Sequence, residues 1–183
     1  LELHVEQGPV LEKAGTTIGI VTGVQGISWT EYRVTGTSNH AGTTPMGLRH
    51  DAGFVAAAIT TEARHLADRL GGDQVATVGV TELRPNLVNV IANHARITVD
   101  LRNTTEDTLQ QAEASMTQYI AKLAAIEGVE VVSRSLARFC PVEFDPDVMN
   151  LIETTANERG YACQRLPSGA GHDAQMFEPN CPT

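Results

Sequence analysis

Two short segments of this 183-residue chain place a histidine where packing gives no reason for one. The segment HVEQGP ends an apolar alternation and sets His4 and Gln7 three residues apart beside a Gly-Pro turn. The segment SNHAGTTPM sets His40 in a loop of small residues, which lets the backbone approach another molecule closely. An imidazole can donate a hydrogen bond, accept one or bind a metal near neutral pH, so both histidines are candidates for chemistry.

Two further segments have the composition of anion sites. Asn89 and Arg102 lie on or just before a predicted strand, NVIANHARITVDLRN, and the Arg102 guanidinium can fork onto a carboxylate. The segment SGAGHDA, with Gly171 and His172, has glycines that free backbone N–H groups for an anion. Each candidate has a plain structural alternative that stays open. His4 could be a half-buried histidine and the His40 loop a surface turn. Arg102 could lie on a solvated sheet face, and SGAGHDA could be a Gly-rich turn with a capping Asp173. The other histidines are assigned to structure or solvent: His50, His65 and His94.

The apolar pattern predicts the elements that position these segments. Period-two alternation predicts four strands, over residues 27–37, 74–83, 89–103 and 129–138. Two helices lie between them, one capped by Asp51 and one opened by a capping box at Thr104–Asp107. Their buried stripes are predicted as Val55, Ile59, Ala63, Leu66 and Leu70, and as Leu109, Ala112, Met116, Ile120 and Leu123.

The order of these elements is β-α-β-β-α-β. It predicts an α/β (α+β) fold of ferredoxin-like type over residues 26–138, with a four-stranded antiparallel sheet and two helices on one face. Residues 1–25 read as a strand end and a connector, and residues 139–183 as a helix, a short strand and a Gly-rich turn. We expect these flanks to be pieces of a second domain that the ferredoxin-like unit interrupts, and the chain to be part of a longer protein.

Composition excludes several classes of partner. The net charge of −9, with no run of Lys or Arg, argues against nucleic acid and anionic membrane surfaces. Three distant cysteines without a CxxC pattern argue against a disulfide framework, and we expect a cytoplasmic protein. No apolar run approaches the roughly 18 residues of a membrane span.

The four segments in order, ELHVEQGP, NHAGTTPM, NVIANHARITVDLR and LPSGAGHDA, resemble the N-carbamoyl-L-amino-acid hydrolase, allantoate amidohydrolase and β-ureidopropionase branch of the M20 metallopeptidase-like amidohydrolases. The resemblance implies an α/β catalytic domain with a one- or two-metal centre, holding residues 1–25 and 139–183. It also implies that residues 26–138 form an inserted lid that makes a homodimer. The substrate would be a small carbamoyl amino acid or ureido compound, and the cofactor a divalent ion such as Zn, Mn, Co or Ni.

The resemblance also implies a role for each candidate residue. His4 would be a metal ligand and Gln7 a substrate contact beside it. His40 would reach into the site across the dimer and stabilise the oxyanion, as a catalytic residue. The other substrate contacts would be Asn89, Arg102, Gly171 and His172, with Arg102 on the carboxylate.

Departures from the family pattern limit these expectations. The family's other metal ligands and its general base have no counterpart in this chain, so we expect the chain alone to bind no stoichiometric metal and to be inactive. The family's NVIPG turn reads NVIAN around Asn89. An M20-type peptidase or aminoacylase stays open as an alternative, although Gln7 and the NHAGTTPM loop argue against it. A non-catalytic dimerisation module also stays open.

Overall fold

A computed structural model describes residues 1–183, and the chain divides into two compact units. The central unit comprises Ile27–Phe139. The split unit comprises Leu1–Gly26 together with Cys140–Thr183, so the chain leaves this unit, builds the central one and returns.

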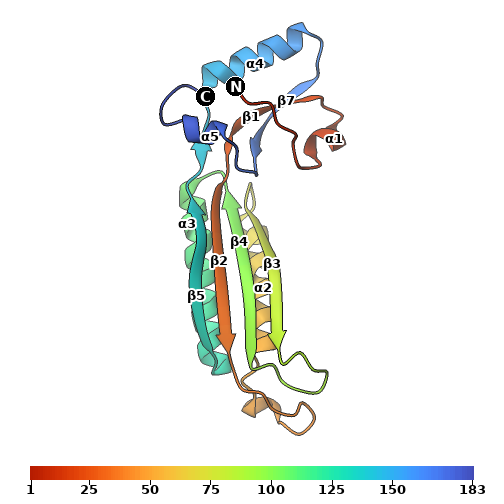
Figure 1. Ribbon diagram of the computed structural model, residues 1–183, viewed down its shortest axis with the longest axis vertical. Coiled ribbons are helices and arrows are strands. Elements are labelled where there is room, and N and C mark those ends of the chain that lie inside the picture. Colours follow the sequence, from red (N-terminus) through yellow and green to blue (C-terminus); the bar gives the residue numbers. More distant parts are fainter. The chain divides into compact units, whose positions relative to one another are not determined.

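The central unit confirms the predicted ferredoxin-like fold, with strand order β3-β4-β2-β5. Figure 1 shows the four antiparallel strands with α2 and α3 on one face. The opposite face of the sheet carries no helix of this unit and is called the open face below. The elements are β2 (Gly26–Thr35), a 3-10 turn η1 (Met46–Leu48), α2 (Ala52–Leu70), β3 (Val75–Arg84), β4 (His94–Asn103), α3 (Glu106–Glu127) and β5 (Glu130–Phe139).

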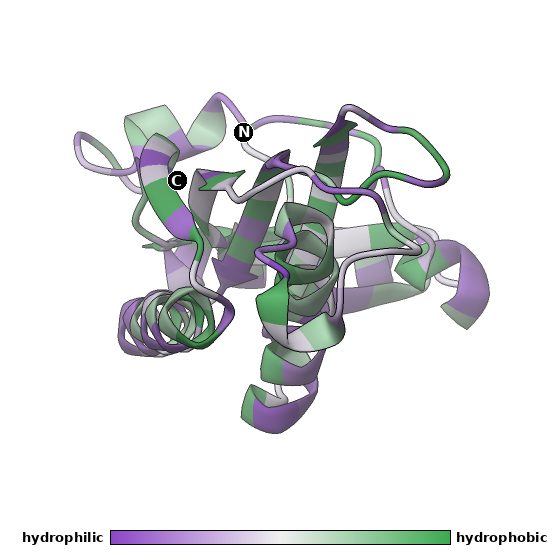
Figure 2. Ribbon diagram, turned by 90° about the horizontal axis from the view of Figure 1, so that it is seen from below, coloured by the Kyte–Doolittle hydropathy of each residue, from purple (hydrophilic) through white to green (hydrophobic).

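The core lies between the sheet and the two helices. Hydrophobic and hydrophilic residues alternate along the strands, as the colouring in Figure 2 shows. Along β4 the side chains at Ala95, Ile97, Val99 and Leu101 are buried, and the residues between them face the open side. Both predicted helical stripes are buried except for Leu70 and Leu123, which pack at the edge of the core. The apolar side chains that recur every 3.6 residues on the helices therefore pack against those that recur every two residues on the strands.

The predicted N-cap is confirmed for α2 and is wrong for α3. Asp51 caps α2 as predicted, since its Oδ1 accepts the N–H groups of Gly53 at 2.8 Å and Phe54 at 3.1 Å. The capping box at Thr104–Asp107 was a wrong prediction. Thr105 is the N-cap of α3 and its side chain caps no backbone N–H. The backbone N–H of Thr105 instead donates to Asn103 Oδ1 at 2.9 Å.

The end of α3 explains why His50 has a structural role. Gly128 ends the helix with a φ of +61°, the left-handed region that favours glycine. A Cβ at Gly128 would lie 2.6 Å from His50 Nδ1, so this position has no room for a side chain. His50 Nδ1 lies 2.9 Å from the carbonyl oxygen of Glu127, and this contact satisfies one of the last carbonyls of α3.

The split unit is built on a three-stranded sheet of order β6-β1-β7. Strand β1 pairs parallel with β7 and antiparallel with β6. The elements are α1 (Val10–Ala14), β1 (Ile18–Val24), β6 (Val142–Glu143), α4 (Pro146–Glu158), β7 (Cys163–Ser168) and α5 (Ala174–Phe177). No helix in either unit is long and apolar enough to cross a membrane.

The first residues of the split unit do not form the strand that their alternation indicates. Leu1 and Leu3 are 96% and 97% exposed, and no strand pairs with this segment. Alternation alone makes an extended segment, because a strand also needs a neighbour that supplies hydrogen bonds. His4 therefore lies on an irregular segment that leads into α1.

Candidate functional site

The seven predicted site residues lie in three places. Those of the split unit come from the N-terminal segment and the loop after β7. The rest belong to the central unit, two in neighbouring loops at one end of its sheet and one at the other end of β4. The split unit holds His4, Gln7, Gly171 and His172. In the central unit, His40 and Asn89 lie in the neighbouring loops, and Arg102 lies at the other end of β4.

In the split unit, the N-terminal segment and the loop after β7 meet around His172. The rings of His4 and His172 are 4.7 Å apart, in an edge-on arrangement. Glu2 fixes this contact, because its Oε2 accepts the N–H of Ala174 at 2.9 Å. The other side of the His172 ring is held by Ser168, whose Oγ lies 2.6 Å from Nε2. The fold thus gathers two imidazoles and a carboxylate from opposite ends of the chain.

This cluster has the composition of a metal site. Each of Glu2, His4 and His172 offers one ligand atom, and these atoms lie within 4.8 Å of one another. The His172 Nδ1 atom is buried and has no hydrogen-bond partner, so it is a free ligand atom directed at Glu2 Oε1, 3.9 Å away. Two ligands of one tetrahedral zinc are about 3.3 Å apart, so a small inward shift would be needed. The donors fit a divalent cation in kind and number.

This grouping was missed by the sequence analysis, which assigned His4 alone to a metal. The fold places Glu2 and His172 beside His4, so the chain offers three candidate metal ligands and not His4 alone. The sequence held a signal in the Glu-x-His spacing of ELH, which was not used. The absence of a stoichiometric metal in the isolated chain stays a prediction.

Two details of the split unit differ from the sequence analysis. Backbone N–H groups of the SGAGHDA loop were expected to be free for an anion, but that of Ala170 donates to Ser168 Oγ and that of His172 to Gln175 Oε1. The alternative of a capping Asp173 is also wrong, because its side chain makes no cap hydrogen bond to α5. Gln7 is exposed and has a left-handed φ of 56°, a conformation that non-glycine residues adopt rarely.

At one end of the central unit, a network of hydrogen bonds fixes the His40 loop. Arg49 donates to the carbonyl oxygens of Ala41 at 2.6 Å and of Thr44 at 3.1 Å. His40 Nδ1 accepts the N–H of Gly42 at 3.1 Å, which assigns the proton of the neutral ring to Nε2. The exposed His40 therefore presents an N–H donor on a loop that hydrogen bonds from the Arg49 side chain hold in place.

Asn89 lies beside His40. The N–H of Ala41 donates to the Asn89 carbonyl at 2.9 Å, and His40 forms a β-bridge with Val90. The predicted third strand was too long at its start, because β4 begins at His94 and Asn89 belongs to the preceding loop. Two further backbone hydrogen bonds join the loops. The N–H of Ile91 donates to the carbonyl oxygen of Asn39, and that of Gly36 donates to the carbonyl oxygen of Asn93.

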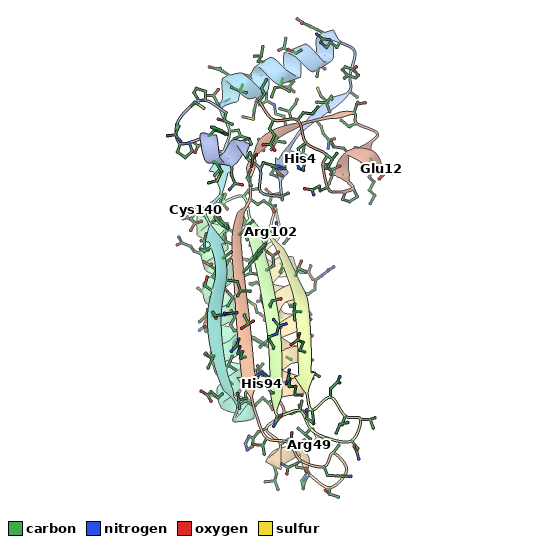
Figure 3. All side chains as sticks on the ribbon, viewed as in Figure 1. His4, Glu12, Arg49, His94, Arg102 and Cys140 are labelled. Atoms are coloured by element: carbon green, nitrogen blue, oxygen red, sulfur yellow. The ribbon has the colours of Figure 1, made fainter.

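Arg102 lies near the opposite end of β4. Its guanidinium donates to both carboxylate oxygens of Asp100 at 2.7–3.1 Å and lies 5.7 Å from the centre of the Trp29 ring. Asp100 and Trp29 hold the planar fork in one orientation on the open face. Figure 3 shows Arg102 and His94 at opposite ends of the strand. Arg102 lies eight residue steps along the strand from His94, or about 27 Å.

A buried carboxylate at the centre of the open face was not singled out by the sequence analysis. Glu31 is 4% exposed at its side chain and lies 2.9–3.4 Å from Arg33, Arg96 and Arg134. Burial raises the pKa of Glu31, but the Arg96 hydrogen bond and the charges of Arg134 and Arg33 outweigh burial and hold it below its usual value. Arg96 also pairs with Glu82 at 2.6 Å.

Known proteins match both the sequence and the fold. The peptidase dimerisation domain family of M20 type matches residues 22–127. The chain is 36% identical over 182 residues to the N-carbamoyl-L-amino acid amidohydrolase of Geobacillus stearothermophilus and 35% identical over 187 aligned positions to the allantoate amidohydrolase of Escherichia coli. Each match covers the whole of this chain and 44% of the relative, so the chain spans less than half the length of these proteins.

The solved structures agree. A crystal structure of an amidase of the hydantoinase/carbamoylase family from Burkholderia multivorans matches 96% of this chain with a TM-score of 0.93 and 36% identity. The match covers 43% of that amidase. The similarity therefore extends through both units of the chain and not only through the dimerisation domain.

Proposed function

This chain belongs to the M20 family by its peptidase dimerisation domain, and from that premise we propose that the full-length protein is a metal-dependent amidohydrolase of N-carbamoyl or ureido C–N bonds. The observation that carries the proposal is the match over the whole chain to proteins named as carbamoyl-amino-acid and allantoate amidohydrolases. The substrate would be a carbamoyl amino acid or allantoate. Water adds across the C–N bond, and the carbamoyl group leaves as carbon dioxide and ammonia.

The split unit would supply metal and substrate contacts. His4 would hold the divalent metal with Glu2 as a further donor. His172, the third donor of the cluster, would contact the substrate beside the metal, together with Gln7 and Gly171. A bound metal would supply a water of lowered pKa as the nucleophile. The proposal is supported by the buried, unpartnered His172 Nδ1, because such an atom is costly unless a ligand satisfies it.

His40 would stabilise the charge that grows on the carbamoyl oxygen. The hydrogen bond from Gly42 to Nδ1 leaves the proton on Nε2, where it can be donated to the oxyanion. An oxyanion donor is typically worth about 3–4 kcal/mol in the transition state. Asn89, on the adjoining loop, would bind the ureido group, and Arg102 would bind the carboxylate.

These assignments require two copies of the chain. Within one copy the His40 and Asn89 loops and Arg102 lie at opposite ends of a strand about 27 Å long, far more than the length of a carbamoyl amino acid. We therefore propose a homodimer in which His40 and Asn89 of one copy and Arg102 of the other contact the same substrate.

The reaction is tested with the full-length protein and four substrate classes: carbamoyl amino acids, allantoate, acyl amino acids and dipeptides. We expect release of ammonia from the first two classes and no cleavage of the others. Cleavage of acyl amino acids or dipeptides alone would identify a peptidase or aminoacylase instead. Inactivity on every class would favour a non-catalytic dimerisation module.

The shared site is tested by mixing two impaired variants. His40→Ala should lower kcat about a hundredfold or more with little change in melting temperature. Arg102→Ala should lower kcat/KM by about 1.5–3 kcal/mol, and Arg102→Lys should rescue poorly because it lacks the planar fork. After subunit exchange, each mixed dimer has one intact site, so a 1:1 mixture should recover about a quarter of the wild-type activity.

A matched control uses the double variant His40→Ala/Arg102→Ala mixed with wild type. If the site is shared, every mixed dimer loses both sites and the activity per wild-type chain falls. If one copy makes the whole site, the mixed dimer keeps one intact site and this activity is unchanged. No recovery in the first mixture together with unchanged activity per wild-type chain in the second would contradict the shared site.

A further inference from the structure

The two halves of the central sheet differ in the side chains that they turn toward the helices. Figure 1 shows α2 behind β3 and β4, and α3 behind β2 and β5. On the α2 side, apolar strand residues pack into the core: Ala76, Val78, Leu83, Ala95 and Ile97. On the α3 side, small hydroxyl residues occupy four inward positions of β2 and β5: Ser28, Thr30, Ser133 and Ser135. Places where a sequence departs from the apolar pattern of its fold are often functional.

These four residues line a cavity of about 240 Å³ between α3 and the sheet, which is called the hydroxyl cavity below. Its floor is apolar and buried, since it is formed by Val99 and Leu101 of β4. Exposed lining residues mark its mouth: Thr117 of α3, and Ser133 and Ser135 of β5. One water molecule occupies about 30 Å³ in the liquid, so the cavity has room for about eight waters or for one small organic molecule.

Ser28 is the strongest sign that the hydroxyl cavity takes a ligand. The residue is only 5% exposed and lies in the lining of the cavity. Its hydroxyl forms no hydrogen bond with another group of the chain. A buried hydroxyl without a partner destabilises a fold, whereas an alanine at the same position would not. A ligand that hydrogen-bonds to Ser28 would account for the serine.

The charged residues around the hydroxyl cavity disfavour an anion. Every nitrogen of the Arg138 guanidinium already donates a hydrogen bond: Nε to Glu113 at 2.8 Å, Nη2 to Glu106 at 2.5 Å, and Nη1 to the carbonyl oxygen of Phe139 at 2.9 Å. One guanidinium beside two carboxylates leaves an excess of negative charge. Burial raises the pKa of Tyr32, so its hydroxyl stays protonated. The groups left for a ligand are therefore neutral hydroxyls, which both donate and accept hydrogen bonds.

We infer that the hydroxyl cavity is a binding site for a small neutral polyhydroxy compound, that is, a polyol or a monosaccharide. The hydroxyl groups of this ligand pair with those of Ser28, Thr30 and Ser135. Its C–H groups pack against the apolar floor of Val99 and Leu101, because small-molecule sites combine apolar walls with a few convergent polar groups. The lining includes none of the seven candidate site residues, and the inference does not rest on the proposed amidohydrolase activity.

The test measures the binding of xylitol and glucose to the full-length protein by saturation-transfer NMR. Gluconate is the matched control, since it is close to glucose in size but carries a negative charge. We expect a Kd of about 1 mM or tighter for at least one neutral probe, and at least tenfold weaker binding of gluconate. No signal from either neutral probe at about 10 mM would overturn the inference and leave a cavity filled by water. Gluconate that binds as tightly as glucose would overturn the assigned ligand class.

Matched variants test whether the probe binds in the hydroxyl cavity. Ser28→Ala removes the buried hydroxyl, and Thr30→Val replaces a hydroxyl by a methyl group of similar shape, so each should weaken binding about tenfold. The control Thr98→Val makes the same replacement on the open face of β4 and should leave the Kd unchanged within about twofold. Equal affinity in the wild type and all three variants would overturn the inference, because the probe would then bind elsewhere.

Melting temperatures separate loss of the ligand from loss of the fold. Without a probe, Ser28→Ala should melt at or above the temperature of the wild type, because it removes a buried hydroxyl that has no partner. The neutral probe that binds, added at about ten times its wild-type Kd, should raise the melting temperature of the wild type clearly more than that of Ser28→Ala. A Ser28→Ala protein that melts well below the wild type without a probe would overturn the inference, because the hydroxyl would then serve the fold itself.

Discussion

The two units of this chain bury very different amounts of apolar side chain. The core of the central unit contains sixteen buried residues in one cluster, from Tyr32 to Ile120. In the split unit the buried hydrophobic residues are Ile20, Val24, Met149 and Ala156. The central unit therefore has an apolar core large enough to stabilise it, whereas the split unit has only a thin apolar layer between α4 and its sheet.

The two units also differ in what surrounds their buried ionisable groups. In the central unit the buried Glu31 is surrounded by three arginines, so its charge is satisfied within the unit. In the split unit the buried His172 Nδ1 has no partner. A buried polar atom without a hydrogen-bond partner is also found in the central unit, at Ser38 Oγ, but His172 Nδ1 is the one that lies beside other candidate metal ligands, Glu2 and His4.

The largest effect should come from the core of the central unit. Leu109→Ala removes a side chain with 0% exposure and should cost about 2–5 kcal/mol of unfolding free energy. The single tryptophan, Trp29, lies in the central unit, so its fluorescence in a urea titration follows that unit. The control Met149→Ala, in α4, should move the Trp29 transition much less. Equal shifts would break the contrast between the units.

A second, smaller effect should depend on pH. The pKa of Glu31 is lowered in the folded protein, so its carboxylate contributes stability above the unfolded pKa of about 4.5, and this is lost as pH falls through the folded pKa. Glu31→Gln should therefore lower the melting temperature most at neutral pH, and the gap to wild type should narrow below about pH 4.5.

The matched control is Glu82→Gln, which removes a more exposed partner of the same Arg96. The Arg96 hydrogen bond also lowers the pKa of Glu82, but the exposed position screens the pair, so the melting temperature should change less. A gap for Glu31→Gln that is the same at pH 7 and pH 3.5 would contradict the ion-pair explanation of the buried carboxylate.

The central unit could be predicted from the sequence because its elements leave local patterns. The helical stripes at Val55–Leu66 and Leu109–Ile120 and the alternation of β4 follow from the side of each element that must face the core. The start of α3 could not be predicted in this way. Which threonine becomes the N-cap depends on Asn103, because its side-chain oxygen accepts a hydrogen bond from the backbone N–H of Thr105.

The split unit and the arrangement of the site depended on long-range pairing, which local patterns do not encode. Alternation at Leu1 and Leu3 predicted a strand, but no neighbouring strand is present to pair with it. Each candidate residue could be chosen from its residue type. The sequence did not predict that His40 and Asn89 lie side by side, or that Arg102 lies far from both. These follow from the register of β3 and β4 and from a bridge between loops far apart in sequence.

The smallest effect should distinguish the starts of the two helices of the central unit. Asp51→Ala removes the side chain that accepts two N–H groups of α2 and should cost about 1 kcal/mol. Thr105→Ala, at the same position of α3, removes no cap hydrogen bond and should cost about 0.5 kcal/mol or less. Both are measured by the Trp29 transition in urea. A larger cost for Thr105→Ala would mean that its hydroxyl contacts with Asn103 and Thr108 stabilise the helix start as strongly as direct capping.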